Sequence, residues 1–148
     1  MLRGALAGMA AAAAWAAVEP LAARVFGPPA GYSDLRLLGA VLTRDGPRWR
    51  AAGLGAHLLN GAVFGAAFAR AGRRGPLQGL AAAQVENAVL WPAMAVVDRL
   101  HPDRRSGAWP PLVRNPRVFA YEAGVHAVFG IVLGALLPAQ PSSPGSAS

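Results

Sequence analysis

The sequence predicts an all-α membrane protein, a four-helix transmembrane bundle. Hydrophobic residues make up 54% of its 148 residues and charged residues only 14%, well below the roughly 25% typical of soluble domains. Four apolar stretches each reach about 20 residues, the length that crosses a hydrocarbon core of about 30 Å. Most arginines lie between these stretches or at their ends, where charged side chains anchor helices at the membrane interface.

The four predicted spans cover residues 2–26, 51–70, 77–98 and 117–137. The first is rich in alanine, and a cleaved signal peptide is the alternative interpretation for it. We favour a span, because the apolar pattern continues beyond Glu19 to Phe26. Residues 1–137 then form one transmembrane domain. The tail, residues 138–148, is rich in Pro, Ser and Gly, which predicts disorder.

The connections between the spans differ in character. In residues 27–50, Ser33 is a candidate N-cap, and leucines follow it at helical spacing, which predicts a short amphipathic helix on the membrane surface. Residues 71–76 predict a tight basic turn. Residues 99–116 contain four prolines, so we expect an extended, non-helical loop there.

Glycines spaced four residues apart indicate where helix backbones approach closely. Three spans contain such a pair: Gly4 with Gly8, Gly61 with Gly65, and Gly130 with Gly134. The third span lacks a clean pair but contains Trp91-Pro92, and the proline predicts a kink. The pattern G-x-H-x-x-x-G-x-x-x-G occurs from Gly55 and again from Gly124. This repeat suggests two related helical hairpins.

Ionisable side chains inside a membrane span are costly, so each is a candidate functional residue that faces the bundle interior. The predicted polar residues are Glu19, His57, Glu86, Glu122 and His126, with Asn60, Gln84 and Asn87 in support. From a rise of about 1.5 Å per residue, Glu19, His57, Glu122 and His126 fall near the long-loop face, whereas Glu86 falls nearer the midplane. We therefore expect the first four to converge in one layer.

Three interpretations of these polar residues remain open. They could hydrogen-bond across helices and stabilise the packing of a structural or partner-binding subunit. They could instead handle protons or small ions, because His and buried Glu titrate near neutral pH. The third is a membrane-embedded metal-dependent enzyme, although the Glu-x-x-His motif of carboxylate-bridged bundles is absent.

The sequence predicts neither a cofactor nor a metal site. It contains no Cys, which excludes disulfides and thiolate metal sites. Nucleophile-elbow, zinc-protease, P-loop and Rossmann motifs are missing, so no enzyme class is indicated.

The charge distribution indicates which kind of partner the chain contacts. The net charge of +7 is not concentrated in one stripe, which argues against nucleic acid and for the lipid bilayer. Ten arginines in or beside the two long loops, against four on the other side, predict cytoplasmic long loops and external termini. Homo-oligomerisation remains open.

Several of these residues resemble one known family. Their positions are Trp15 with Glu19-Pro20, His57 with Phe64, Leu77-Gln78-Gly79-Leu80, and Tyr121-Glu122 with His126. This arrangement is similar to that of the YagU-like bacterial inner-membrane proteins, over the four spans but not over the loops or tail. The resemblance implies a multi-pass protein of the bacterial inner membrane. It also implies that Glu19, His57, Glu122 and His126 matter, but it supplies no reaction.

Overall fold

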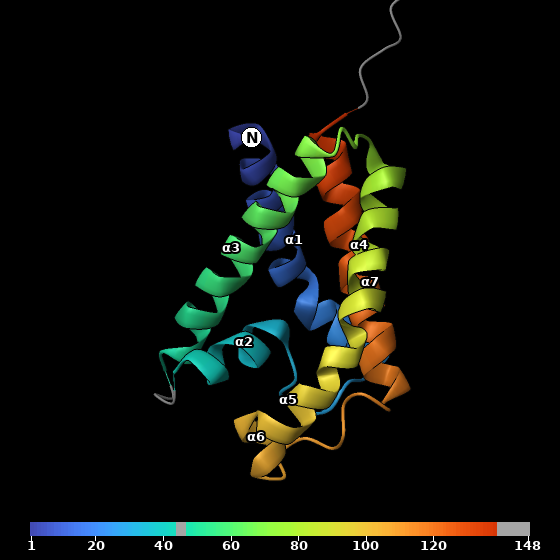
Figure 1. Ribbon diagram of the computed structural model, residues 1–148. Coiled ribbons are helices and arrows are strands. Elements are labelled where there is room, and N and C mark those ends of the chain that lie inside the picture. The colour runs from blue at the N-terminus through green and yellow to red at the C-terminus, as the bar shows by residue number, and fades with distance from the viewer. Residues whose placement is uncertain (44–46, 139–148) are drawn as a thin grey trace, which may run out of the picture.

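The computed structural model describes residues 1–43 and 47–138, and these residues form helices and no strands (Figure 1). The predicted disordered tail falls, apart from Pro138, outside the described residues. The helices are α1 (Leu2–Phe26), α2 (Asp34–Leu42), α3 (Trp49–Arg70), α4 (Pro76–Leu90), the 3₁₀ turn η1 (Trp91–Ala93), α5 (Met94–Leu100), α6 (Pro102–Arg105) and α7 (Pro116–Leu136).

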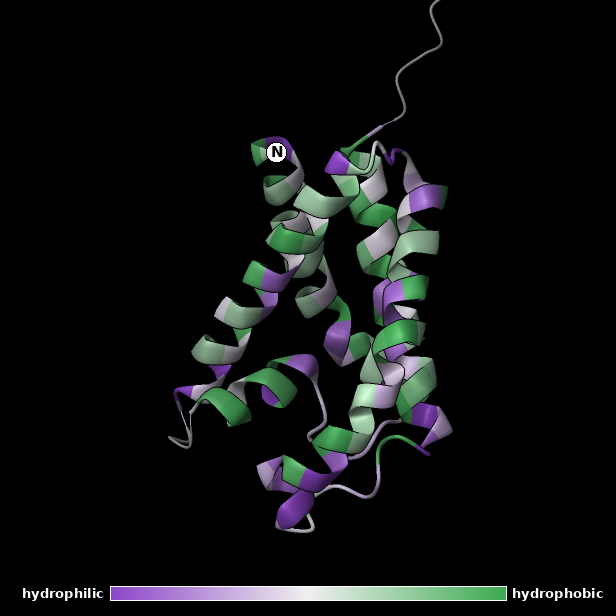
Figure 2. Cartoon of the chain, viewed as in Figure 1, coloured by the Kyte–Doolittle hydropathy of each residue, from purple (hydrophilic) through white to green (hydrophobic). Residues whose placement is uncertain are grey.

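Four helical stretches are long and apolar enough to cross a membrane: α1, α3, the stretch Pro76–Leu100 and α7. The prediction of an all-α bundle with four spans is therefore confirmed, and the chain has the helices of a multi-pass membrane protein. Hydrophilic residues concentrate on α6 and on the connections at both ends of the bundle (Figure 2). This is the distribution that a bilayer imposes on helix ends.

Local sequence signals account for the helix boundaries. Gly27, with a φ of 60°, ends α1 in the left-handed conformation that glycine adopts without strain. Ser33 caps α2 as predicted, because its Oγ accepts the backbone N–H of Arg36. The predicted kink is present at Pro92, where the third span changes from α-helix to a 3₁₀ turn.

The prediction of a non-helical loop over residues 99–116 is wrong in part. The segment begins inside α5 and contains the short helix α6. Pro102 occupies the first position of α6, where a missing N–H removes no helical hydrogen bond. His101 caps this turn by accepting the N–H of Asp103. The proline that was expected to prevent a helix therefore starts one.

Glycines pack the spans into two tight pairs, α1 with α3 and α4 with α7, as the two predicted hairpins require. In the first pair, a Cβ built on Gly61 would lie 2.6 Å from the Gly8 carbonyl oxygen and 2.6 Å from Ala12 Cβ. One turn further along α3, a Cβ built on Gly65 would lie 2.7 Å from Gly8 Cα and would meet the Gly4 carbonyl oxygen. The predicted glycines of α1 and α3 therefore lie directly against one another, backbone to backbone.

The second pair is asymmetric. A Cβ built on Gly130 would lie 2.8 Å from Leu80 Cα, and one built on Gly134 would lie 2.7 Å from Pro76 Cα. Their counterparts are Gly79 of α4 and Gly75 just before this helix, a pair four residues apart that was missed because Gly75 lies in the predicted turn, outside the predicted span. The predicted glycine pair of α7 thus packs on the first turns of α4.

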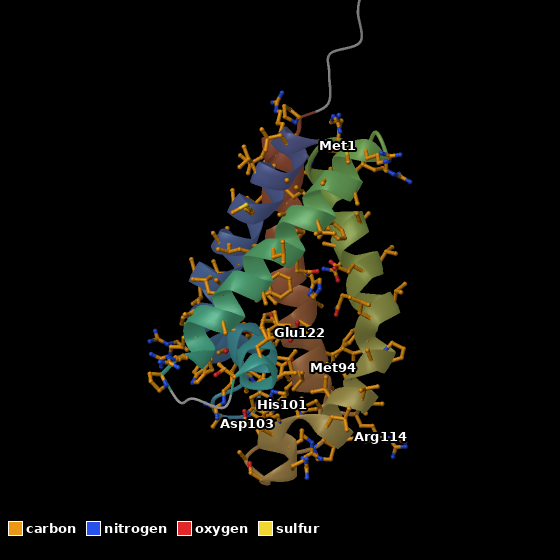
Figure 3. The ribbon with its side chains drawn as sticks, turned by 60° about the vertical axis from the view of Figure 1, so that its left-hand side comes forward. Met1, Met94, His101, Asp103, Arg114 and Glu122 are labelled. Atoms are coloured by element: carbon orange, nitrogen blue, oxygen red, sulfur yellow. The ribbon has the colours of Figure 1, made fainter. Side chains whose placement is uncertain are left out.

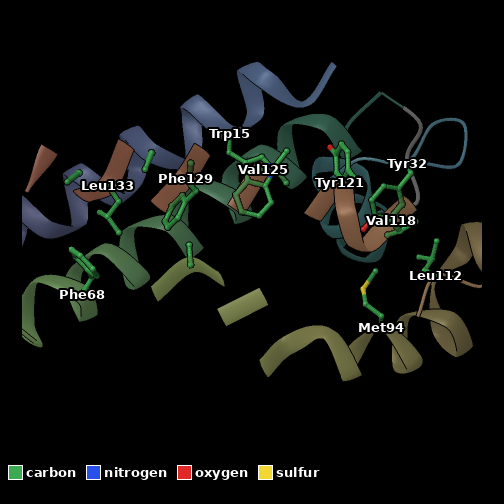
Figure 4. Close-up of a cluster of buried hydrophobic side chains, with 14 of the residues drawn as sticks. Trp15, Tyr32, Phe68, Met94, Leu112, Val118, Tyr121, Val125, Phe129 and Leu133 are labelled. Carbon is green, nitrogen blue, oxygen red and sulfur yellow. The ribbon is translucent and has the colours of Figure 1, made fainter. Parts of the chain in front are cut away.

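Helix α7 is the centre of the bundle, because it packs on both α4 and α1. One face of α7 is fully or almost fully buried, and the buried core includes Trp15 of α1 (Figure 4). That face carries Val118, Tyr121, Val125, Phe129 and Leu133. By contrast, α3 and α4 follow one another in sequence but share no extended interface within the described residues. The order across the bundle is therefore α3, α1, α7, α4.

The close contact between α1 and α3 predicts different effects for two glycines of the same helix. Gly61→Ala should lower thermal stability in detergent by about 1–3 kcal/mol, because the methyl group has no room between the backbones. Gly55→Ala is the matched control, since a Cβ there meets open space. Equal melting temperatures for the two variants would contradict this packing.

Candidate functional site

Polar side chains gather where α1, α2, α3 and α7 meet, at the long-loop end of the bundle. This polar cluster contains Glu19, Tyr32, Asp34, His57, Glu122 and His126, all of them buried. The structure thus brings together the four residues expected to share a layer, and it adds two from the connection after α1. Glu122 lies inside the bundle, above His101 and Asp103 at its base (Figure 3).

Two carboxyl groups of the polar cluster accept hydrogen bonds from the chain that follows α1. The Tyr32 hydroxyl donates to Glu122 Oε1 at 2.5 Å. The backbone N–H of Asp34 donates to Glu19 Oε1 at 2.8 Å. Both donors come from the segment that leads from α1 into α2, which therefore connects a carboxyl of α1 with one of α7.

The two imidazoles contact the same indole ring. The ring of Trp15 lies 4.9 Å from that of His57 and 4.4 Å from that of His126, measured between centroids. His57 Nε2 donates to the Ala12 carbonyl at 3.2 Å, and His126 Nδ1 donates to the Glu122 carbonyl at 2.7 Å. Because a carbonyl only accepts, these bonds assign a proton to one nitrogen of each ring.

Helix α2 carries Asp34 into the cluster because α2 folds back on α3. Gly39 of α2 and Gly53 of α3 allow the two helices to approach backbone to backbone. Burial raises the pKa of Asp34 well above its usual range, and the neighbouring Glu122 and Glu19 raise it further. Burial likewise raises the pKa of Tyr32. The helix expected on the membrane surface therefore inserts its first residue among the spans.

A cavity of about 160 Å³, here called the inner cavity, adjoins the polar cluster. Asp34, Glu86 and Glu122 line it, together with both imidazoles. Asp34 is only 7% exposed, and its Oδ2 makes no hydrogen bond of normal geometry. The indole N–H of Trp15, another lining residue, is also buried and also makes no hydrogen bond of normal geometry. The Trp15 N–H and the Asp34 carboxyl therefore interact with each other only outside normal hydrogen-bond geometry, and neither is fully satisfied.

Glu86 lies apart from the polar cluster, on α4, and is half-buried. It lines the inner cavity and also a second hollow of about 670 Å³, here called the outer groove, which reaches Arg73 and Gln78 at the short-loop end. Across the gap between α3 and α4, Glu86 interacts with the amide of Asn60. It is the residue shared by the two hollows.

The three supporting amides have different environments. Asn60 is exposed on α3 and lines the inner cavity. Asn87 is buried on α4 and lines the same cavity. Gln84 donates instead to the Ala123 carbonyl at 2.8 Å, so it links α4 to α7 and has a packing role.

Arginines are absent from the lining of the inner cavity in the described residues. The ion pairs lie on the short helices instead. Arg36 of α2 binds Asp103 of α6 through two bonds of 2.7 Å, and Arg104 of α6 binds Asp98 of α5 at 2.8 Å. The carboxyl groups that line the inner cavity are therefore left without a permanent cation, in a chain that has 14 arginines.

The loop after α5 covers the cluster from the long-loop side. His101 stacks on Trp109 at 4.6 Å, and Trp109 contacts Tyr32 at 5.2 Å. Asp98 accepts the backbone N–H groups of Leu112 and Val113, which holds the far end of this loop. An ion pair between α2 and α6 joins the cover to the rest of the bundle. These contacts seal the polar cluster beneath a layer of aromatic rings.

The charge states of Arg36, His101 and Asp103, which lie in this covering layer, follow from their contacts. The Arg36 guanidinium lowers the pKa of Asp103, and the same contact raises the pKa of Arg36. Burial lowers the pKa of His101, in keeping with its Nδ1 accepting the Asp103 N–H. At neutral pH the pair is charged and His101 is neutral.

The geometry gives no support to a metal centre. Among the described residues, no three His, Cys, Asp or Glu side chains are positioned to hold a metal ion. The carboxyl groups bond to a tyrosine and a backbone N–H.

Tyr32 and Asp34 were missed by sequence reasoning. Asp34 follows Ser33 at the start of a short amphipathic helix, where an acidic residue is ordinary. No periodicity signals that this end of the helix turns inward. Only the packing of α2 on α3 brings the two residues into the site.

Two buried tyrosines allow the Glu122 contact to be tested. Tyr32→Phe should destabilise the protein by about 1–3 kcal/mol, because Glu122 loses its donor in a buried place. Tyr121→Phe is the comparison: its ring packs 5.6 Å from that of Tyr32, but its hydroxyl interacts with Glu19 rather than Glu122 and makes no hydrogen bond of normal geometry. We expect the first variant to melt clearly earlier in detergent than the second.

Asp34 and Asp103 should affect the pH dependence of stability in opposite ways. Because the pKa of Asp34 is raised, this residue contributes folding stability that is fully present below pH 3.8. That contribution is lost as the pH rises through the raised pKa. Because the pKa of Asp103 is lowered, this residue contributes folding stability that is fully present above pH 3.8. That contribution is lost as the pH falls through the lowered pKa.

In thermal melts across pH, Asp34→Asn should therefore gain on the wild type towards alkaline pH. Asp103→Asn should be less stable at neutral pH and approach the wild type in acid. Parallel curves for the wild type and both variants would contradict these assignments.

No family model, curated protein or solved structure matches the chain in the comparisons made. The likeness to the YagU-like proteins therefore stays a prediction, and the functional argument rests on the geometry of the site.

Proposed function

We propose that this chain is a multi-pass protein of the bacterial inner membrane that takes up and passes protons through its buried carboxyl and imidazole groups. The observation that carries the proposal is the absence of arginine around Asp34, Glu86 and Glu122 in the described lining of the inner cavity. A lone carboxylate in a membrane costs several kcal/mol. A carboxyl group that has no fixed cation avoids this cost by holding a proton.

The two hollows supply a route. The inner cavity begins at the polar cluster, and the outer groove ends near Arg73 and Gln78. Glu86 borders both, so a proton leaving the cluster reaches the other side through this carboxyl.

Away from Glu86, an aromatic contact lies between the inner cavity and the outer groove. Phe129 lines the inner cavity, Phe64 lines the outer groove, and their rings pack edge to face at 5.4 Å. This apolar pair excludes a continuous water column. Passage through Glu86 then favours protons, which move between titratable groups, over hydrated ions.

The inner-membrane location rests on composition and resemblance. All 14 basic residues are Arg, which with the many Ala and Gly residues is typical of GC-rich bacterial genomes, and the motifs resemble YagU-like proteins. The excess of Arg on the long loops supports a cytoplasmic position for the covered end of the bundle.

Substitution of Glu86 tests the route. In proteoliposomes with an imposed pH gradient, Glu86→Gln should reduce proton flux by roughly a hundredfold, the lower end of what a positioned proton-transfer group contributes. Glu86→Asp is the matched control, because it keeps a titratable carboxyl and should retain much of the flux. Flux that is unchanged in Glu86→Gln, or absent from the wild type, would refute the proposal.

A further inference from the structure

We propose that the inner cavity is a binding site for a small alkylammonium ion that enters from the bilayer between α3 and α4. This inference deepens the proposed function and rests on it, since the ion would take the place of protons held by the same carboxyl groups. It names the class of ligand that the site would exchange for protons.

Charge is the first argument. Four of the seven acidic residues of the chain, Glu19, Asp34, Glu86 and Glu122, lie in the polar cluster or line the inner cavity. No described lining residue is an Arg. A cation placed here meets carboxyl groups from three elements and no competing positive charge, in a medium that strengthens the attraction.

The unsatisfied group is the second argument, and it is independent of the number of acidic residues. Asp34 is more than nine-tenths buried, lines the inner cavity, and has an Oδ2 atom without a hydrogen bond of normal geometry. The Trp15 N–H interacts with this carboxyl only outside normal hydrogen-bond geometry, and a buried acceptor without a full donor is costly. A bound ammonium group would satisfy it.

Aromatic rings supply the third argument. Trp15, Trp91 and Phe129 line the same cavity as Asp34. Rings around a carboxylate attract alkylated ammonium ions, because the ring faces are negative and the alkyl groups are apolar. A bare metal ion would gain nothing from these rings and finds no suitable ligand group among the described residues.

Size and access define the ligand further. The volume of about 160 Å³ is below the roughly 300–1,000 Å³ of drug-sized pockets, which limits the ligand to a few heavy atoms. Asn60 and Leu90, from α3 and α4, both line the cavity and are both exposed. Because α3 and α4 share no extended interface in the described part of the chain, this mouth faces the hydrocarbon, and the loops close the other end.

The test uses tert-butylammonium as the probe, because its N–H groups can donate to Asp34, and tert-butyl alcohol as an uncharged molecule of similar size and shape. Titration calorimetry on the purified full chain in detergent should show saturable binding of tert-butylammonium and none of the alcohol. Asp34→Asn should weaken binding at least tenfold, equivalent to about 1.4 kcal/mol. Asp98→Asn is the control, because it removes a carboxylate of α5 that does not line the cavity.

A second variant covers the case in which Asp34→Asn does not fold, as judged by circular dichroism. Phe129→Leu removes a lining ring but keeps the site apolar, and it too should weaken tert-butylammonium binding. Absence of saturable binding, equal binding of the alcohol, or binding unchanged in the folded variants would overturn the inference.

The outcomes separate this inference from the proposed function. If Glu86-dependent proton flux is present but tert-butylammonium does not bind, the ligand assignment fails and proton handling stands. If the probe binds through Asp34 but no proton flux occurs, the cation site stands and the proton route fails.

Discussion

Backbone contact at glycines determines the rest of this structure. Gly8 with Gly61 and Gly65, and Gly79 with Gly130, bring helices together so closely that even one methyl group would not fit. Such contacts provide the dispersion and small-residue packing that replace the hydrophobic effect between helices in lipid. Because each outer helix, α3 or α4, is held against an inner one, the two outer helices are left apart. The space between them becomes the inner cavity and the outer groove.

The distribution of charge follows from this arrangement. Arginines are confined to the helix ends and connections, where they pair with Asp98 and Asp103 or reach water. The carboxyl groups of the polar cluster have a tyrosine, a backbone N–H and an imidazole as neighbours. A structural role alone would be served by amides, which hydrogen-bond without the cost of a buried charge. The proposed proton exchange accounts for carboxyls in these positions.

Helix α2 and the loop after α5 act together as a cover. The first turn of α2 delivers Asp34, the residue before it caps the helix, and Arg36 ties it to Asp103. The stacked rings of His101 and Trp109 lie against Tyr32, whose hydroxyl holds Glu122. A charged pair at the surface is thereby linked, through packed side chains, to the buried carboxyls.

The sequence by itself determined the four spans, the kink at Pro92, the cap at Ser33 and the glycine contacts on three helices, because each depends on local composition or spacing. It also identified the polar residues among the spans, since ionisable groups are rare in apolar stretches. Only the tertiary structure decided which of them meet, because helix rotation is set by contacts between distant segments. Gly79, whose partner Gly75 lies in the predicted turn, and Asp34, at the ordinary first position of a capped helix, carried no clear local signal. Their roles arise where α4 meets α7 and where α2 folds back on α3.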